Sequence, residues 1–161
     1  MTLIALSGAK LQAARKAATE RFLAIAAKHT PEDVTIEYRN GLSGRAWVQS
    51  RRMVAPKPTT RRRLHIYLHE IGHIVLGHSI GSNKRKPKHV QEMEAEQFAF
   101  RIMREEGVPI PRKSKEDAKR YVAHKIKQAK RRGAKKIDKR AQQFATGRLT
   151  ILERGLRQAF G

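Results

Sequence analysis

The segment His69-Glu70-Ile71-Gly72-His73 has the spacing H-E-x-x-H, and its side chains could act together in catalysis. Residues four apart on a helix lie one turn apart on the same face, so His69 and His73 can direct both imidazoles at one ion. Neutral imidazole suits Zn²⁺. Glu70 lies one position round from His69, close to the open coordination position, where it can take a proton from metal-activated water. The spacing predicts a hydrolytic zinc site with Glu70 as the general base.

A catalytic zinc ion usually has three protein ligands and one water, so a third ligand must come from another element. The longer metzincin motif would place glycine at position 76 and histidine at position 79. This chain has Leu76 and Ser79 there, which excludes that class. His78 lies five residues beyond His73 and points well round the helix, so we expect it to support the site rather than to ligate. The remaining candidates open the next predicted helix: His89, Glu92, Glu94 and Glu96.

Two helical segments together resemble a known family. The sequence HEIGHIVLGH, followed by EMEAEQFAF, is similar to the ImmA/IrrE-type zinc metallopeptidases. That gluzincin-like family has H-E-x-x-H on one helix and E-x-x-A-[ND]-x-F-A on the next. The resemblance covers about residues 34–106 and implies that Glu92 is the third zinc ligand. Glu96 stands where the family has Asn or Asp, and its carboxylate can still accept a ring N–H from a zinc histidine.

Two alternatives for the third ligand stay open beside Glu92. SprT-like DNA-associated proteases use a third histidine after a similar interval, and the segment PKHVQEM can be aligned with that pattern through His89. Glu94 is the other alternative. The E-x-x-A signature is the more specific pattern, so we take Glu92 as the ligand.

The resemblance implies a zinc-dependent peptidase whose extended protein or peptide substrate pairs with the edge of a small sheet. Such proteins often occur beside DNA-binding regulators and in phage or transferable elements, so a DNA-associated protein is a candidate substrate. No oxyanion-stabilising group can be assigned, because His65, Tyr67 and His78 are available only by residue type. The alternative hypothesis is a nucleic-acid-binding regulatory or phage protein that keeps the zinc fold.

Hydrophobic periodicity predicts the elements that position these residues. Helices are expected over residues 8–28, 61–76, 89–106, 114–132 and 138–144, and strands over 34–39, 46–48 and 53–55. Thr59 or Thr60 should cap the second helix, and Ser114 with Asp117 resembles a capping box for the basic helix. The second helix has an apolar stripe that consists of Leu64, Leu68, Ile71 and Val75.

These elements predict an α+β fold, with a small three-stranded sheet on a zincin-type helix bundle. The connections between the strands are short, so the sheet is expected to be mostly antiparallel. Residues 1–110 would form the zincin-like metallopeptidase domain and residues 111–161 a basic helical extension. Within that extension, residues 149–152 are expected to dock the tail against the rest of the chain.

Composition limits the other classes of protein. The 161 residues include no cysteine, which excludes disulfide scaffolds, thiolate zinc ribbons and cysteine nucleophiles. No apolar run approaches the roughly 20 residues of a membrane span, and no basic segment precedes the first apolar stretch as in a secretory signal. We therefore expect a cytoplasmic protein without a membrane partner.

The charge is strongly positive, with 36 Lys and Arg against 14 Asp and Glu and a formal net charge of +22. Residues 111–140 alone hold 14 basic and 3 acidic side chains, a composition that attracts polyanions. A nucleic-acid partner would bind there, although Tyr121 is the only aromatic residue in the run, which argues against a stacking platform for single strands. The candidate contacts are Lys119, Arg120, Lys127, Lys130, Arg131, Arg132, Lys135 and Lys136.

Overall fold

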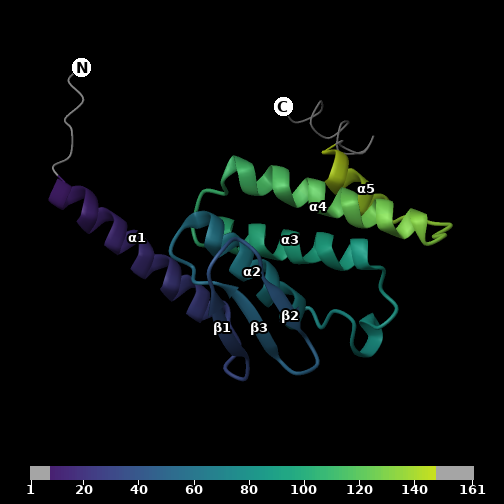
Figure 1. The fold of residues 1–161 in the computed structure, drawn as a ribbon, viewed down its shortest axis with the longest axis horizontal. Helices are drawn as coiled ribbons and strands as arrows, with labels where there is room; N and C mark the ends of the chain where they lie inside the picture. The colour runs from purple at the N-terminus through teal and green to yellow at the C-terminus, as the bar shows by residue number, and fades with distance from the viewer. Residues whose placement is uncertain (1–7, 148–161) are drawn as a thin grey trace, which may run out of the picture.

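The architecture is α+β and is built as layers, with the sheet on α2, α2 on α3, and α3 on the pair α4 and α5 (Figure 1). It is a computed structural model that describes residues 8–147. The predicted residues 149–152 lie outside the described part. The elements in chain order are α1 (Gly8–His29), β1 (Thr35–Arg39), β2 (Arg45–Trp47), β3 (Arg52–Pro56), α2 (Arg61–Val75), the short 3₁₀ helix η1 (Gly81–Asn83), α3 (Lys88–Glu105), α4 (Arg112–Arg131) and α5 (Lys139–Thr146).

The sheet is mixed, so the expectation of a mostly antiparallel sheet was wrong. Its order is β1-β3-β2, in which β1 pairs with β3 in parallel and β2 pairs with β3 antiparallel. The prediction assumed that neighbours in sequence would pair. Instead β2 itself forms part of the connection over residues 40–51, which is long enough for a parallel return. Because β3 takes the centre, β2 has an outer edge that no strand of residues 8–147 pairs with.

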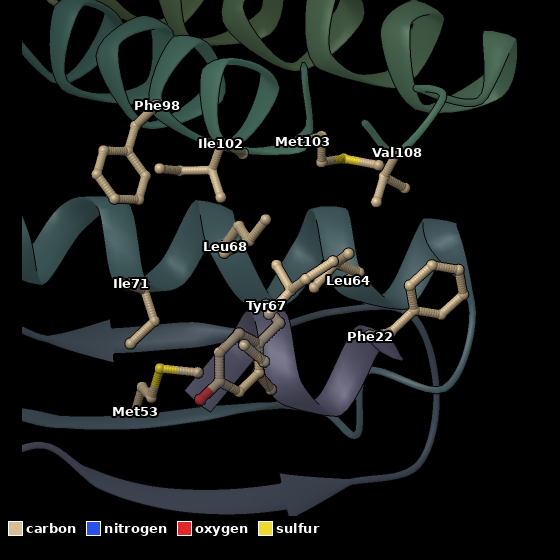
Figure 2. Packing of buried hydrophobic residues seen from close by; sticks show 14 of the residues in the cluster. Phe22, Met53, Leu64, Tyr67, Leu68, Ile71, Phe98, Ile102, Met103 and Val108 are labelled. Atoms are coloured by element: carbon tan, nitrogen blue, oxygen red, sulfur yellow. The ribbon is translucent and has the colours of Figure 1, made fainter. Parts of the chain in front are cut away.

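Helix α2 lies between the sheet and α3. Thr60 caps its first turn by accepting a hydrogen bond from the Arg63 backbone N–H, which confirms the predicted start. Leu64, Leu68 and Ile71 are fully buried (Figure 2). Val75, the fourth residue of the predicted stripe, is the last residue of the helix and is 47% exposed, whereas Ile74 beside it is buried.

The core above α2 comes from α3 and the segment after it. Phe98, Ile102 and Met103 point down from α3 toward α2, and Val108 fills the end of the same layer (Figure 2). On the opposite side, Met53 of β3 packs below Ile71. The core therefore fixes α2 on both faces, and the residues between its buried positions are held in place.

Helices α4 and α5 pack on α3 through a second apolar cluster that consists of Val90, Met93, Val122, Ile126 and Ala141. Helix α5 begins after Asp138, whose side chain accepts hydrogen bonds from the backbone N–H groups of Arg140 and Ala141, as predicted. The capping box at Ser114 was wrong. Helix α4 starts earlier, after Pro111, and the Ser114 side chain is buried within the first turn.

Candidate metal centre

Two neighbouring helices bring the site together. Helix α2 carries His69 and His73 one turn apart, and α3 faces them with Glu92 in its second turn. The close approach depends on Gly72, where a Cβ atom would lie 3.3 Å from both the Cα and the carbonyl oxygen of Ala95 and 3.1 Å from the Phe98 ring. Gly72 and Ala95 therefore let the helices approach closely enough for side chains of both to reach one point.

Three donor atoms converge between the helices. The Nε2 atoms of His69 and His73 lie 3.2 Å apart, and Glu92 Oε2 lies 3.3 Å from the first and 3.2 Å from the second. Ligands at about 2.0–2.1 Å from a tetrahedral zinc ion are separated by about 3.3 Å. The spacing of His69, His73 and Glu92 matches that value, so this buried group could hold a metal ion.

Glu96 contacts the ring nitrogen of His69 that is not among the three donors. His69 Nδ1 lies 3.2 Å from Glu96 Oε1, an ion-pair contact whose geometry falls short of a hydrogen bond. The other oxygen of Glu96 accepts a 2.7 Å hydrogen bond from His65 Nε2, and the His65 ring stacks on Phe100 at 5.0 Å. Glu96 thus fixes the side of His69 that faces away from the candidate ion.

His73 is held by a separate chain of contacts. Its Nδ1 lies 2.7 Å from His78 Nδ1, and His78 Nε2 donates to Glu94 Oε2 at 3.1 Å. Lys86 donates to the same oxygen at 2.7 Å. In the tautomers that fit these contacts, His73 Nδ1–H donates to His78, which leaves the Nε2 lone pair of His73 for an ion.

The charges of the group favour a cation between the rings. Burial raises the pKa of Glu92, but the close contacts with the rings of His69 and His73 outweigh burial and hold that pKa below its ordinary value. Burial lowers the pKa of His73. Burial also opposes a charge on His69, but Glu96 and Glu92 outweigh it and raise the pKa of His69 well above its usual value. The carboxylates therefore stabilise a positive charge here, and His, His and Glu form a donor set typical of catalytic zinc.

Glu70 lies beside the donors but is not one of them. Its side chain packs against the backbone at Gly44, just before β2, where a Cβ atom would lie 2.5 Å from Glu70 Cγ. Burial raises the pKa of Glu70 to about 7, with the neighbouring His69 opposing the shift and Glu92 and Glu96 adding to it. A carboxylate of that pKa can both accept and return a proton near neutral pH.

An open cleft runs over the metal group between two walls. Residues 44–50, which include β2, line one side, and the C-terminal half of α4 with the loop after it lines the other. Tyr121 of α4 lies in the cleft with its ring edge-on to His69, at 6.4 Å between ring centroids. Burial and the carboxylates of Glu92 and Glu70 raise the pKa of Tyr121 to about 12, so its hydroxyl remains a hydrogen-bond donor.

The structure separates the candidates for the third ligand. Glu92 joins both histidines. His89 is buried nearby, but its Nε2 accepts a 3.3 Å hydrogen bond from the Asp138 backbone N–H at the start of α5. Glu94 contacts His78 and Lys86 instead. Neither of these two alternatives belongs to the group of donors that the structure brings together.

Sequence reasoning missed three contributors to the site. Tyr121 was noted only as an aromatic residue in a basic run and His65 only by its type, and no contact with the site was predicted for Gly44. Their roles depend on contacts between distant elements, which no local pattern reports. The eight predicted nucleic-acid contacts are all exposed on α4 or the loop after it, and Arg132 and Lys136 also line the cleft.

Compared with protein-family models, curated proteins and solved structures, the chain has no significant match. Within residues 8–147, no helix has the length and apolar content that a membrane crossing requires.

Proposed function

We propose that this protein is a zinc-dependent peptidase. The observation that carries the proposal is a group of three donors, spaced for one ion, beside a buried carboxylate on the floor of an open cleft. A structural zinc site is usually closed by four protein ligands, whereas the described residues offer three here and a cleft beside them. The free edge of β2 on one wall suits an extended polypeptide, which pairs with such an edge through its backbone.

His69, His73 and Glu92 would hold the ion, and Glu96 and His78 would keep the two imidazoles aligned. When bound, Zn²⁺ would polarise a substrate carbonyl and make water acidic enough to attack near neutral pH. Glu70 would accept the proton of the attacking water and return it to the leaving amine. Tyr121 would donate a hydrogen bond to the carbonyl oxygen as that oxygen gains negative charge.

The resemblance of residues 34–106 to the ImmA/IrrE-type family supports the same ligand set from the sequence. We extend the proposal to a cytoplasmic enzyme whose substrate is a protein, with a DNA-associated regulator as the first candidate.

Metal analysis combined with a peptidase assay tests this proposal. We expect one zinc ion per chain in the purified protein and its loss in Glu92→Ala. Glu70→Gln should keep the ion but cleave a peptide library about 10²–10⁴-fold more slowly, because it cannot accept the proton. Full activity in Glu70→Gln would refute the role of Glu70 as general base. Full zinc content in Glu92→Ala would refute the assignment of Glu92 as third ligand.

A second candidate function, nucleic-acid binding by α4, is favoured by the unpaired charge of that surface. Of the eight exposed candidate contacts, Arg120 pairs with Asp117, and the others have no ion-pair partner within residues 8–147. Lysine and arginine side chains of such a surface bind nucleic-acid phosphates and release the counterions that are condensed on the nucleic acid.

Replacement of Lys119, Lys127 and Lys130 by Ala tests this second candidate. Each lost phosphate contact should reduce the slope of log affinity against log salt by about 0.7–0.9. An unchanged slope with a DNA duplex and with single-stranded RNA would show that this surface only keeps the protein soluble.

A further inference from the structure

Outside the metal centre, the Lys, Arg, Asp and Glu side chains among the described residues that line the cleft are all positive. Five cationic side chains face it, from Arg45 on the strand wall, Lys88 at the start of α3, and Lys125, Arg132 and Lys136 on the α4 wall. The only carboxylates among the described lining residues are Glu70 and Glu92, which belong to the metal centre. A ligand with negative side chains would therefore find complementary charge along the whole cleft, away from the floor.

None of these five cations is neutralised by an ion pair within residues 8–147. Lys88 donates to the neutral groups of Ser79 and Gln91. Lys125 lies over the Tyr121 ring at 5.0 Å, and Arg45 lies over the Trp47 ring at the same distance. This contrasts with the N-terminal half of α4, where Asp117 pairs with Lys113 and Arg120. The positive charge in the cleft is thus left for a ligand.

The shape of the cleft favours a polypeptide over a nucleic acid. The backbone edge of β2 offers hydrogen bonds in the spacing of another strand, which a nucleic acid cannot match. The two aromatic rings that line the cleft are already engaged. Both Arg45 and Arg52 contact Trp47, and Tyr121 packs against His69 and Lys125. Bases would find no free stacking platform there.

We propose that the cleft selects an extended acidic segment of a protein, with Asp and Glu side chains near the scissile bond. The segment's backbone adds a strand to β2, and its carboxylates pair with Lys125, Arg132 and Lys136 across the cleft. This substrate class rests on the proposed peptidase function and specifies it.

Binding to the inactive but full-length, zinc-loaded Glu70→Gln protein tests the proposal without any need for turnover. The probes are a fluorescein-labelled peptide rich in Asp and Glu, the same peptide with Asn and Gln in their place, and a single-stranded DNA oligonucleotide of equal charge, each followed by fluorescence anisotropy. The acidic peptide should bind at least about tenfold more tightly than its amide counterpart at low ionic strength, and the preference should shrink as salt screens it.

Two matched charge reversals locate the binding site. Arg132→Glu with Lys136→Glu should remove the preference for the acidic peptide. Lys115→Glu with Lys139→Glu changes the net charge equally, on exposed residues outside the cleft, and should keep the preference. Circular dichroism of each variant confirms that it folds. N-methylation of alternate amides in the acidic peptide should also abolish binding, because it blocks pairing with β2.

Each contrary result has a defined meaning. Equal affinity for the acidic and amide peptides, or loss in both double variants alike, would overturn the acidic preference. A DNA oligonucleotide that binds more tightly than the acidic peptide, and that depends on Arg132 and Lys136, would assign the cleft to nucleic acid and also overturn it. Cleavage of neutral peptides without charge preference would refute this inference alone, whereas acidic-peptide binding in a wild-type protein that cleaves nothing would refute the peptidase.

Discussion

The two candidate ligand histidines, His69 and His73, are aligned by different partners. Glu96 spans His69 and His65, and its long side chain reaches both rings from one position on α3. His73 depends on His78, which is itself tied to Glu94. Because a ring that is free to rotate holds an ion less well, these supporting groups should matter for metal affinity although they do not reach the ion.

Glu96→Ala should weaken zinc binding by about 10–100-fold, because His69 loses the carboxylate behind it. Competition with a chromophoric chelator measures this. Glu105→Ala is an exposed change on the same helix that removes a pairing with Arg101, and it should leave the affinity unchanged. Equal zinc affinity in Glu96→Ala and the wild type would show that the aligning contact is dispensable.

Tyr121→Phe should lower kcat by about 10²–10³-fold with little change in zinc content, because one donor to the developing oxyanion is lost. Steady-state kinetics on a cleaved peptide gives the number. A change confined to KM would instead mean that Tyr121 only helps to bind the substrate.

The three candidate ligands were accessible from the sequence, but much of what surrounds them was not. His69, Glu70 and His73 were predicted from the geometry of a single helix, and Glu92 was predicted from the family resemblance of the next helix. In the sequence, Tyr121 is a single tyrosine among lysines and arginines. Its place in the cleft results from the packing of α4 on α3, which the local sequence does not report.

Among the elements, the strand β2 has a direct bearing on Glu70. Gly44 leaves no side chain between the strand and the carboxylate, and a Cβ atom there would overlap Glu70. The start of β2 therefore fixes the position of the proposed general base and at the same time brings the strand edge beside it.

Gly44→Ala should push Glu70 aside and reduce kcat by at least about tenfold, because catalysis falls steeply when a reacting group moves by an ångström. Zinc content should remain normal, since the displaced side chain of Glu70 is not one of the three candidate donors. Gly8→Ala, where an added Cβ would meet nothing within 4 Å, is the matched control. Unchanged kinetics in Gly44→Ala would show that Glu70 has room to adapt.

The positions of the helices and strands were predicted well, and their pairing was not. Periodicity reports which face of a segment is apolar, and this sufficed for all five longer helices of residues 8–147. It does not say which strand takes the centre of a sheet, so the parallel pair β1–β3 was missed. The error at Ser114 has a similar cause. The sequence does not distinguish a serine that caps a helix from a serine that is buried in its first turn.

In the molecule as a whole, α4 and α5 cover apolar side chains of α3. Val90 and Met93 are buried beneath them. Removal of the chain after Pro111 would expose both residues and open the cleft. A truncated protein would therefore lose stability as well as basic charge, and a change in its binding could come from either loss. For that reason, charge reversal is the cleaner test of what the basic helices bind.

A charged contact joins α1 to the end of α3. Glu106 accepts hydrogen bonds from Lys28 at 2.7 Å and from His29 at 2.6 Å. These two partners, Lys28 first, hold the pKa of Glu106 below its ordinary value of 4.5. A carboxylate with a lowered folded-state pKa stabilises the fold above its unfolded pKa and loses that contribution as the pH falls through the folded value.

Glu106→Gln should therefore lower Tm at neutral pH, and the gap from the wild type should close as the pH falls below about 4.5. Thermal unfolding followed by circular dichroism across that range measures it. A gap that persists unchanged at the acid end would mean that the contact acts through packing rather than charge.

The unpaired side of β2 also has a consequence for the protein in concentrated solution. An open strand edge is a template on which a second copy of the same chain can aggregate. Arg45 lies on this strand without an ion-pair partner in residues 8–147, and every copy carries the same large positive charge. Two such positively charged copies repel each other, so the edge proposed to pair with a substrate strand should resist pairing with a second copy of this chain.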